Sequence, residues 1–372
     1  MKVFKDIFFG LVLVLLAVTT VRAESNEIPI TPAETLSSLL FPNNQRSFFF
    51  LTASNENVES NDFYDYSKIS TQAQEDSRLK NLKRWYEATT HSSSTFAVGF
   101  YPYGVTFDGA NIWVSNSGSN SLTKLRANDG ALIGTYAVGP LPRGIVFDGT
   151  NIWVANSGSN RITKLRASDG TILGTYAVGF YPDGVAFDGA NIWVANSGSN
   201  NVTKLRASDG IVLGTYAVGY NPIGVIFDGA NIWVANSNSN SITKLRASNG
   251  FVLGTYAVGW IPKWVAFDGV NIWVTNYGNG KVTKLRAGDG IALGTYAVGI
   301  CPYGIAFDGV NIWVANTGSN NVIKIRASDG TVLGAYNVGL NPRGVFFDGA
   351  NVWVVNHDSV TITKLLSQVD IY

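Results

Sequence analysis

A short segment of aromatic and charged residues around a fixed proline recurs along most of this chain. It appears seven times at a spacing of 40 residues, and its first copy is Phe100-Tyr101-Pro102-Tyr103. The proline keeps its place in each copy, whereas its neighbours change. Aromatic rings supply large contact surfaces, and charged side chains supply ion pairs and hydrogen bonds. These positions are therefore suited to recognising a ligand.

Three further residues join this candidate surface because they break the repeat. Trp264 replaces a glycine of the other copies, Tyr277 replaces a serine, and His357 interrupts the last Ser-Gly loop. The candidate ligand-binding residues are Tyr101, Tyr103, Arg143, Tyr181, Asp183, Tyr220, Trp260, Lys263, Trp264, Tyr277, Tyr303, Arg343 and His357. The competing interpretation is neutral drift, because turns tolerate substitution more readily than packed strands.

Acid–base catalysis would depend on His357, the one histidine of the repeat region, with Asp358 and Asp183 as its acidic neighbours. Every glutamate of the chain precedes that region. Three isolated residues do not supply both a metal site and a general base, so we assign no catalytic residue and name His357 as the candidate if the protein is an enzyme. We expect no metal and no cofactor.

The composition narrows the class of protein and of partner. Of 372 residues, 46% are hydrophobic and 14% charged, as in a chain that buries a large core. The 27 basic and 26 acidic residues nearly cancel, which argues against a nucleic-acid partner. One cysteine excludes an intramolecular disulfide, and two histidines cannot complete the usual zinc site.

The elements that must position the candidate residues follow from the repeat itself. The motif Asp-Gly-x-Asn-(Ile/Val)-Trp-Val begins at Asp108 and returns every 40 residues up to Asp348. In the first copy, four β-rich segments cover 104–107, 111–116, 122–126 and 132–138, and turn residues separate them. We name these expected strands A, B, C and D. The absence of a 3.6-residue period excludes helical repeats.

The two ends of the repeat region favour a closed ring. The seventh copy stops without strand D, and the missing segment stands before the first copy at 94–99. A β-solenoid has no reason to begin with the element that it lacks at its end. We therefore expect an all-β fold, a seven-bladed β-propeller with four antiparallel strands per blade, closed by an N-terminal outer strand that completes the last blade.

Alternating strand directions assign the connections to two faces. The D–A and B–C connections share one face with the candidate residues, and the A–B and C–D turns share the other. We expect the seven repeated tryptophans, from Trp113 to Trp353, to form core. We also expect the A–B aspartates, such as Asp108, to pair with the strand C arginines, such as Arg126, in preference to a functional basic stripe.

The repeat resembles known propeller families. The stretch from Val185 to Leu205 is similar to the repeats of YVTN-type β-propellers and, more distantly, of the streptogramin (virginiamycin B) lyase group and NHL-repeat proteins. The resemblance covers 93–366 and implies the propeller fold. The lyase group implies a histidine acid or base and acidic magnesium ligands, which the missing glutamates and the single histidine do not reproduce.

The flanking segments indicate export. Residues 1–23 carry two lysines, an apolar run and a small-residue cleavage pattern, typical of a signal peptide, and the run is short for the alternative, a membrane anchor. Residues 24–92 are interpreted as a linker in which the pattern favours a short helix over 72–86, and 367–372 as a tail. We expect a periplasmic or extracellular monomer whose mature chain does not insert into a membrane.

The sequence therefore favours an exported, non-enzymatic propeller that binds a protein, glycan or small molecule through the D–A and B–C face. The alternatives are a streptogramin-lyase-like or hydrolytic enzyme with its site near His357, and a structural cell-surface spacer.

Overall fold

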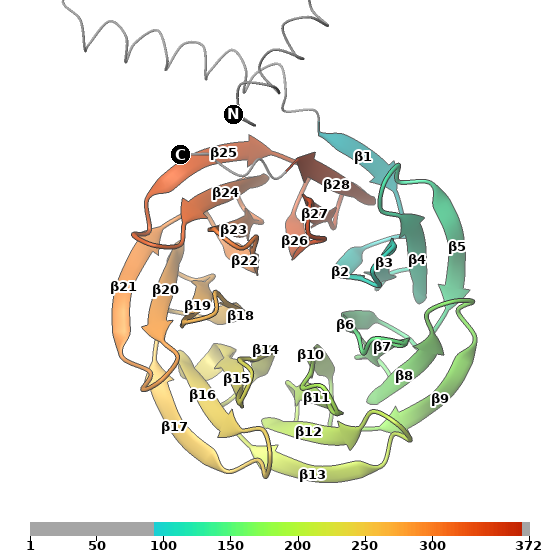
Figure 1. Cartoon of the computed structure of the whole chain (residues 1–372), viewed down its shortest axis with the longest axis horizontal. Helices are drawn as coiled ribbons and strands as arrows, with labels where there is room; N and C mark the ends of the chain where they lie inside the picture. The colour runs from blue at the N-terminus through green and yellow to red at the C-terminus, as the bar shows by residue number, and fades with distance from the viewer. Residues whose placement is uncertain (1–92, 367–372) are drawn as a thin grey trace, which may run out of the picture. The chain divides into compact units, whose positions relative to one another are not determined.

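The computed structural model describes residues 93–366, which form a ring of seven four-stranded antiparallel sheets (Figure 1). The predictions for 1–92 and 367–372 lie outside the described residues. The ring confirms the seven-bladed propeller expected from the sequence. In each sheet the strands follow one another from the centre outwards in chain order, except in the blade that closes the ring.

The innermost A strands are β2 (Pro102–Phe107), β6 (Pro142–Phe147), β10 (Pro182–Phe187), β14 (Pro222–Phe227), β18 (Pro262–Phe267), β22 (Pro302–Phe307) and β26 (Pro342–Phe347). The B strands are β3 (Asn111–Asn116), β7 (Asn151–Asn156), β11 (Asn191–Asn196), β15 (Asn231–Asn236), β19 (Asn271–Asn276), β23 (Asn311–Asn316) and β27 (Asn351–Asn356).

The C strands are β4 (Ser121–Arg126), β8 (Arg161–Arg166), β12 (Asn201–Arg206), β16 (Ser241–Arg246), β20 (Lys281–Arg286), β24 (Asn321–Arg326) and β28 (Thr361–Leu366). The outermost D strands are β1 (Ser94–Ala97), β5 (Leu132–Ala137), β9 (Ile172–Ala177), β13 (Val212–Ala217), β17 (Val252–Ala257), β21 (Ala292–Ala297) and β25 (Val332–Asn337). One short 3₁₀ turn, Ser237–Ser239, follows β15. Blade 1 is β2–β5, and blade 7 is β26–β28 with β1.

Blade 7 draws its strands from both ends of the repeat region. Its sheet order is β1-β28-β27-β26, and β1 runs antiparallel to β28 with Thr95 opposite Thr363. The strand that precedes the first copy thus supplies the outer strand that the seventh copy lacks.

Each A strand begins two residues earlier than the sequence predicted. Pro102 pairs with Asn116 across an irregularity in the register that ends at Val105. A proline can stand at the first position of an edge strand because no ladder hydrogen bond is needed from its nitrogen. As a result, the variable residue after each proline belongs to the innermost strand and not to a loop.

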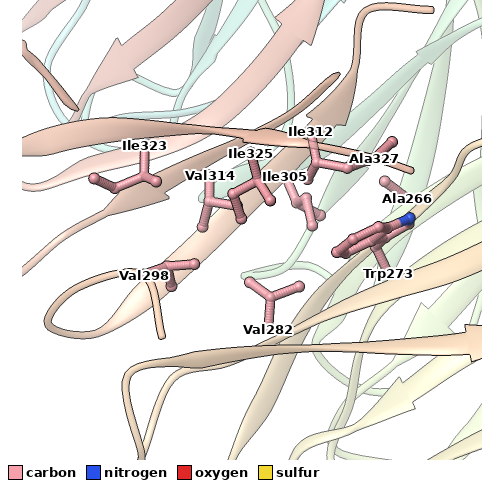
Figure 2. Close-up of a cluster of buried hydrophobic side chains, with 10 residues drawn as sticks. All are labelled: Ala266, Trp273, Val282, Val298, Ile305, Ile312, Val314, Ile323, Ile325 and Ala327. Atoms are coloured by element: carbon pink, nitrogen blue, oxygen red, sulfur yellow. The ribbon is translucent and has the colours of Figure 1, made fainter. Parts of the chain in front are cut away.

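The repeated tryptophans are core, as expected, and join neighbouring blades. Trp273 of blade 5 is fully buried against Ile305, Ile312 and Val314 of blade 6 (Figure 2). Its indole Nε1 donates to Asp268 Oδ2 at 2.8 Å. Burying a side chain of this size contributes a few kcal/mol, roughly 25 cal/mol for each Å² of apolar surface.

The repeated lysine of strand C also joins blades. Lys284 Nζ lies 5.0 Å from the centre of the Trp273 ring and donates to the carbonyl oxygen of Ala327, in the next blade, at 2.7 Å. Its charge is therefore compensated by a ring face and by backbone oxygens.

The expected pairing of A–B aspartates with strand C arginines is wrong. Arg126 pairs with Asp129 of the following C–D turn, with Nη1 2.9 Å from Oδ2. The Asp108 carboxylate accepts hydrogen bonds from Trp113 Nε1 and from the backbone of Asn111. Asp129 is only three residues from Arg126, so this pair orders less chain than one between separate turns.

Each D–A connection is fixed to the neighbouring B–C loop by backbone hydrogen bonds. Ser117 N donates to the Tyr101 carbonyl at 3.0 Å, and Gly118 N donates to the Phe100 carbonyl at 2.9 Å. Tyr101 has φ 50°, and the residue before the proline is left-handed in all seven copies. These left-handed residues turn the chain sharply into the innermost strand, so the loop face has one backbone shape and variable side chains.

Candidate ligand-binding cavity

A cavity of about 400 Å³ lies on the D–A and B–C face, where the innermost strands surround the centre of the ring (Figure 1). Every blade contributes to it the residue that follows its fixed proline. These seven residues are Tyr103, Arg143, Asp183, Ile223, Lys263, Tyr303 and Arg343. Around them stand three B–C loop residues, Ser197, Tyr277 and Thr317, and two D–A residues, Asn221 and Asn341.

Four of these side chains form a hydrogen-bonded chain across the channel. Asp183 is fully buried, and its carboxylate accepts from Arg143 Nη1 at 2.5 Å and from the Tyr103 hydroxyl at 3.2 Å. The Tyr103 hydroxyl also contacts the Tyr303 hydroxyl. Because Tyr103 has one hydroxyl hydrogen and gives it to Asp183, Tyr303 must be the donor in that contact. The chain links β22, β2, β10 and β6.

Burial fixes the protonation of this chain. Burial and the nearby Asp183 charge raise the pKa of Tyr303 to about 12, and the same causes raise the pKa of Tyr103 well above its usual value. Asp183 also raises the pKa of Arg143. At neutral pH both tyrosines are therefore neutral and Arg143 is charged.

Two more cations line the cavity without such a partner. Arg343 lies against two tyrosine rings, with its Cζ 5.2 Å from the centre of Tyr103 and 5.4 Å from that of Tyr303. Lys263 Nζ lies 5.6 Å from the centre of the Tyr277 ring. Burial lowers the pKa of Lys263, Arg143 and Arg343 lower it further, and only Asp183 acts in the opposite direction.

The most exposed candidates stand outside the cavity lining. Trp260 is 67% exposed, and Tyr101, Tyr181 and Tyr220 are also more than half exposed. Together with Phe100, Phe180, Ile300 and Leu340, they form a ring of exposed apolar side chains on the D–A connections, which we call the rim. Trp264, which takes the place of a glycine, stacks against Tyr303 with ring centres 6.4 Å apart.

His357 also lies outside the cavity lining. Its ring stacks on Tyr101 at 5.0 Å, and its Nδ1 is 2.5 Å from Asp358 Oδ1. Burial lowers the pKa of His357, whereas the hydrogen bond to Asp358 opposes the shift. Asp183 is bonded to Arg143 and Tyr103 instead, so the structure does not unite His357 with both of its acidic neighbours.

The structure thus divides the predicted site residues into two groups. The cavity contains Tyr103, Arg143, Asp183, Lys263, Tyr277, Tyr303 and Arg343, whereas Tyr101, Tyr181, Tyr220, Trp260, Trp264 and His357 lie outside its lining. Sequence analysis missed five lining residues: Ser197, Asn221, Ile223, Thr317 and Asn341. The signal that would find them is the repeat itself, because each occupies a position that bears a predicted residue in another copy.

Within residues 93–366, no three side chains of His, Cys, Asp or Glu come together in a group that could hold a metal ion. None of the described residues belongs to a helix with the length and hydropathy of a membrane span.

Comparison with known proteins shows the fold. No family model matches the chain, and no curated protein sequence matches it. Kuenenia stuttgartiensis hydrazine synthase superimposes with a TM-score of 0.66 at 20% identity, over 73% of this chain and 96% of that one. A streptogramin B lyase superimposes with a TM-score of 0.64 at 21% identity, over 74% of this chain and 97% of that one.

A functionally unknown protein from Desulfotomaculum acetoxidans gives a TM-score of 0.59 at 15% identity, over 71% of this chain and 92% of that one. The chain therefore has the seven-bladed propeller fold, with distant similarity to streptogramin B lyase.

Proposed function

We propose that this propeller is a non-enzymatic binding protein that holds a small molecule in the cavity on its D–A and B–C face. The observation that carries the proposal is the coincidence of the cavity with the positions where the seven copies differ. All seven residues after the fixed prolines line the cavity, and they comprise five different residue types. The repeated residues, by contrast, are explained by packing between blades.

The size and lining of the cavity suit a small organic ligand. Its volume of about 400 Å³ falls within the roughly 300–1,000 Å³ typical of small-molecule sites. Three tyrosines supply aromatic surface, and side-chain amides and hydroxyls supply neutral hydrogen bonds. The backbone hydrogen bonds between the D–A and B–C connections hold these groups in place before a ligand arrives.

A cavity-filling variant tests this function. The purified full chain is screened by thermal shift against small carboxylates, phosphates, sugars and amines. We expect at least one class to stabilise the chain, and Ile223→Trp to abolish that effect because the larger ring occupies the cavity. Leu141→Trp is the matched control, since it adds the same ring at an exposed D–A position outside the lining. Binding that survives Ile223→Trp would contradict the proposal.

The enzyme alternative depends on His357, and the variant His357→Ala distinguishes it from the binding function. His357 is held by Asp358 and Tyr101 beside the cavity and not in its lining. Under the binding function, His357→Ala leaves the thermal shift by the ligand nearly unchanged, and the ligand is recovered intact after incubation. Conversion of the ligand that disappears in His357→Ala would favour the enzyme.

Export is part of this proposal. The lysines, apolar run and small-residue site within residues 1–23 support it. Expression in a bacterium, followed by N-terminal sequencing of the exported chain, is expected to begin at Glu24. We also expect a monomer by light scattering.

A further inference from the structure

The cavity lining carries more positive than negative charge. It includes the basic residues Arg143, Lys263 and Arg343, against the single acidic residue Asp183. The whole chain, by contrast, has a formal charge of only +1. An excess of two positive charges in a small, partly buried space is costly unless an anion enters it.

Asp183 cannot neutralise the excess because its hydrogen bonds are already committed. The fully buried carboxylate forms an ion pair with Arg143 and accepts from Tyr103. The negative charge of Asp183 is therefore balanced by the positive charge of Arg143, and Tyr103 is neutral. Lys263 and Arg343 are the two cations left over.

Arg343 has unused donors at a buried site. Its guanidinium lies over the rings of Tyr103 and Tyr303, and its Nε is buried without a hydrogen-bond partner. No ion pair or hydrogen bond joins Arg343 to another residue of 93–366. Buried donors in proteins nearly always have a partner, so this arrangement points to a missing acceptor.

Lys263 is the second uncompensated cation. It forms no ion pair with a described residue, and its Nζ lies over the Tyr277 ring. Arg143 and Arg343 repel its charge, burial disfavours it, and the paired Asp183 is the one acidic group that favours it. An anion beside Lys263 would favour its charged form and so offset these costs.

From this geometry we propose that the ligand is a small organic anion, with a carboxylate or phosphate group held by Lys263 and Arg343 and a flat or apolar remainder against Tyr103, Tyr277 and Tyr303. The inference rests on the proposed function and names its ligand class. Arg343 offers the planar donor set that matches carboxylate and phosphate oxygens, and Lys263 adds a compact charge.

Four probes with one ring and different head groups test the charge requirement. Benzoate, phenyl phosphate, benzyl alcohol and benzylamine are titrated into the full chain by calorimetry. We expect benzoate or phenyl phosphate to bind at least tenfold more tightly than benzyl alcohol, and benzylamine not to bind. The order of the two anions distinguishes a carboxylate site from a phosphate site.

Matched variants identify the cations. Lys263→Met and Arg343→Gln should each weaken binding of the preferred anion roughly 10- to 100-fold, as loss of a charge-assisted hydrogen bond does. Lys281→Met and Arg161→Gln are the controls, because they remove exposed cations from the same face outside the lining. We expect the controls to stay within twofold of the unmodified chain.

The pH dependence gives a second readout. Because Lys263 loses its proton more easily in the empty cavity, affinity for the anion should fall as pH rises through its lowered pKa, and Lys263→Met should flatten that profile. If benzyl alcohol binds as tightly as the anions, and Ile223→Trp abolishes binding of all of them, the anion inference is wrong and the proposed binding function is still supported. Failure of all four probes to bind would count against both.

Discussion

On the face that carries the A–B and C–D turns, which we call the uniform face, all seven blades repeat one aspartate–tryptophan contact. On the opposite face, which we call the variable face, the blades share a backbone shape but present different side chains. Each A–B aspartate accepts from the indole of its own blade, as Asp188 does from Trp193 at 2.8 Å. The D–A connections keep their left-handed residue and proline but present tyrosine, arginine, aspartate, isoleucine or lysine to the channel.

This difference between the two faces shows that residues for stability and residues for recognition occupy different positions of the repeat. Residues at blade interfaces contact the next blade, so a change in one copy disturbs two sheets. The residue after the proline lines the cavity, and its contacts with other blades differ from copy to copy: Arg143 pairs with Asp183, whereas Arg343 lies against tyrosine rings. Variation is therefore tolerated where the ring encloses space, and it is suppressed where blades touch.

The largest expected effect comes from a tryptophan tied to the uniform face. Trp193→Ala removes a fully buried ring and leaves Asp188 without its indole donor, and we expect a loss of about 3–5 kcal/mol in the free energy of unfolding. Trp260→Ala, at a rim position that is 67% exposed, should cost less than about 0.5 kcal/mol. Chemical denaturation of both variants measures the contrast, and equal losses would break it.

The lysine contacts between blades give the next effect. Lys204 Nζ donates to the Ala247 carbonyl at 2.7 Å and to the Ser248 carbonyl at 3.2 Å in the next blade. We expect Lys204→Met to cost about 1–3 kcal/mol, because buried carbonyl oxygens lose their donor. Arg206→Gln removes only an exposed ion pair with Asp209 and should cost about 0–1 kcal/mol. The same denaturation assay compares them, and the reverse order would contradict the assignment.

Acid should weaken the uniform face first. Burial alone would raise the pKa of Asp188, yet hydrogen bonds from Trp193, Asn191 and Ala190 hold it below its usual value. A carboxyl whose folded pKa is lowered contributes stability above its unfolded pKa, about 4, and that contribution is lost as pH falls through the folded pKa. We expect the denaturation midpoint to decline below about pH 4, and Asp188→Asn to reduce the decline. A midpoint independent of pH in this range would exclude the mechanism.

The smallest effect concerns His357 on the variable face. Because burial lowers its pKa, we expect its NMR titration below 6.5, with the His91 signal removed by His91→Gln. Asp358→Asn should lower the value further, since Asp358 favours the charged ring, and Arg343→Gln should raise it. Neutral His357 therefore contributes stability above the unfolded pKa that is lost as pH falls. Titration above 6.5 would contradict the described burial.

The fold could be predicted from the sequence because the repeat shows both the length of a blade and the displacement of one outer strand to the start of the repeat region. The 40-residue spacing gave the blades, and the isolated segment near Thr95 gave the strand that pairs with β28. The start of strand A was misjudged because a proline usually signals a turn, whereas here Pro102 opens the strand beside a register irregularity. The predicted pairing of A–B aspartates with strand C arginines was wrong because the period of the repeat gives the positions of the residues but does not show which side chains pair.

The site was only half readable. Repeat position identified Tyr103 as a candidate but could not separate it from Tyr101, two residues earlier. Tyr101 lies outside the lining, and its ring stacks on His357 at 5.0 Å. The backbone does not make this difference, because Asn221 and Asn341 have the same left-handed conformation and line the cavity. Ile223 was overlooked because an aliphatic side chain suggests no chemistry, although it occupies the same strand position as Arg343.

The pairing of β1 with β28 has a consequence for biosynthesis. Six blades are contiguous in the chain and can fold as the ribosome delivers them, but the seventh must wait for the last strand to emerge. Until then β1 has no partner strand. Once β28 has emerged, its outer edge is free until β1 pairs with it, and that edge also fits a strand of the Gly-Thr-Tyr-Ala-Val type from another nascent chain. Crowded synthesis should therefore yield dimers that exchange outer strands, and slow synthesis should yield sealed rings.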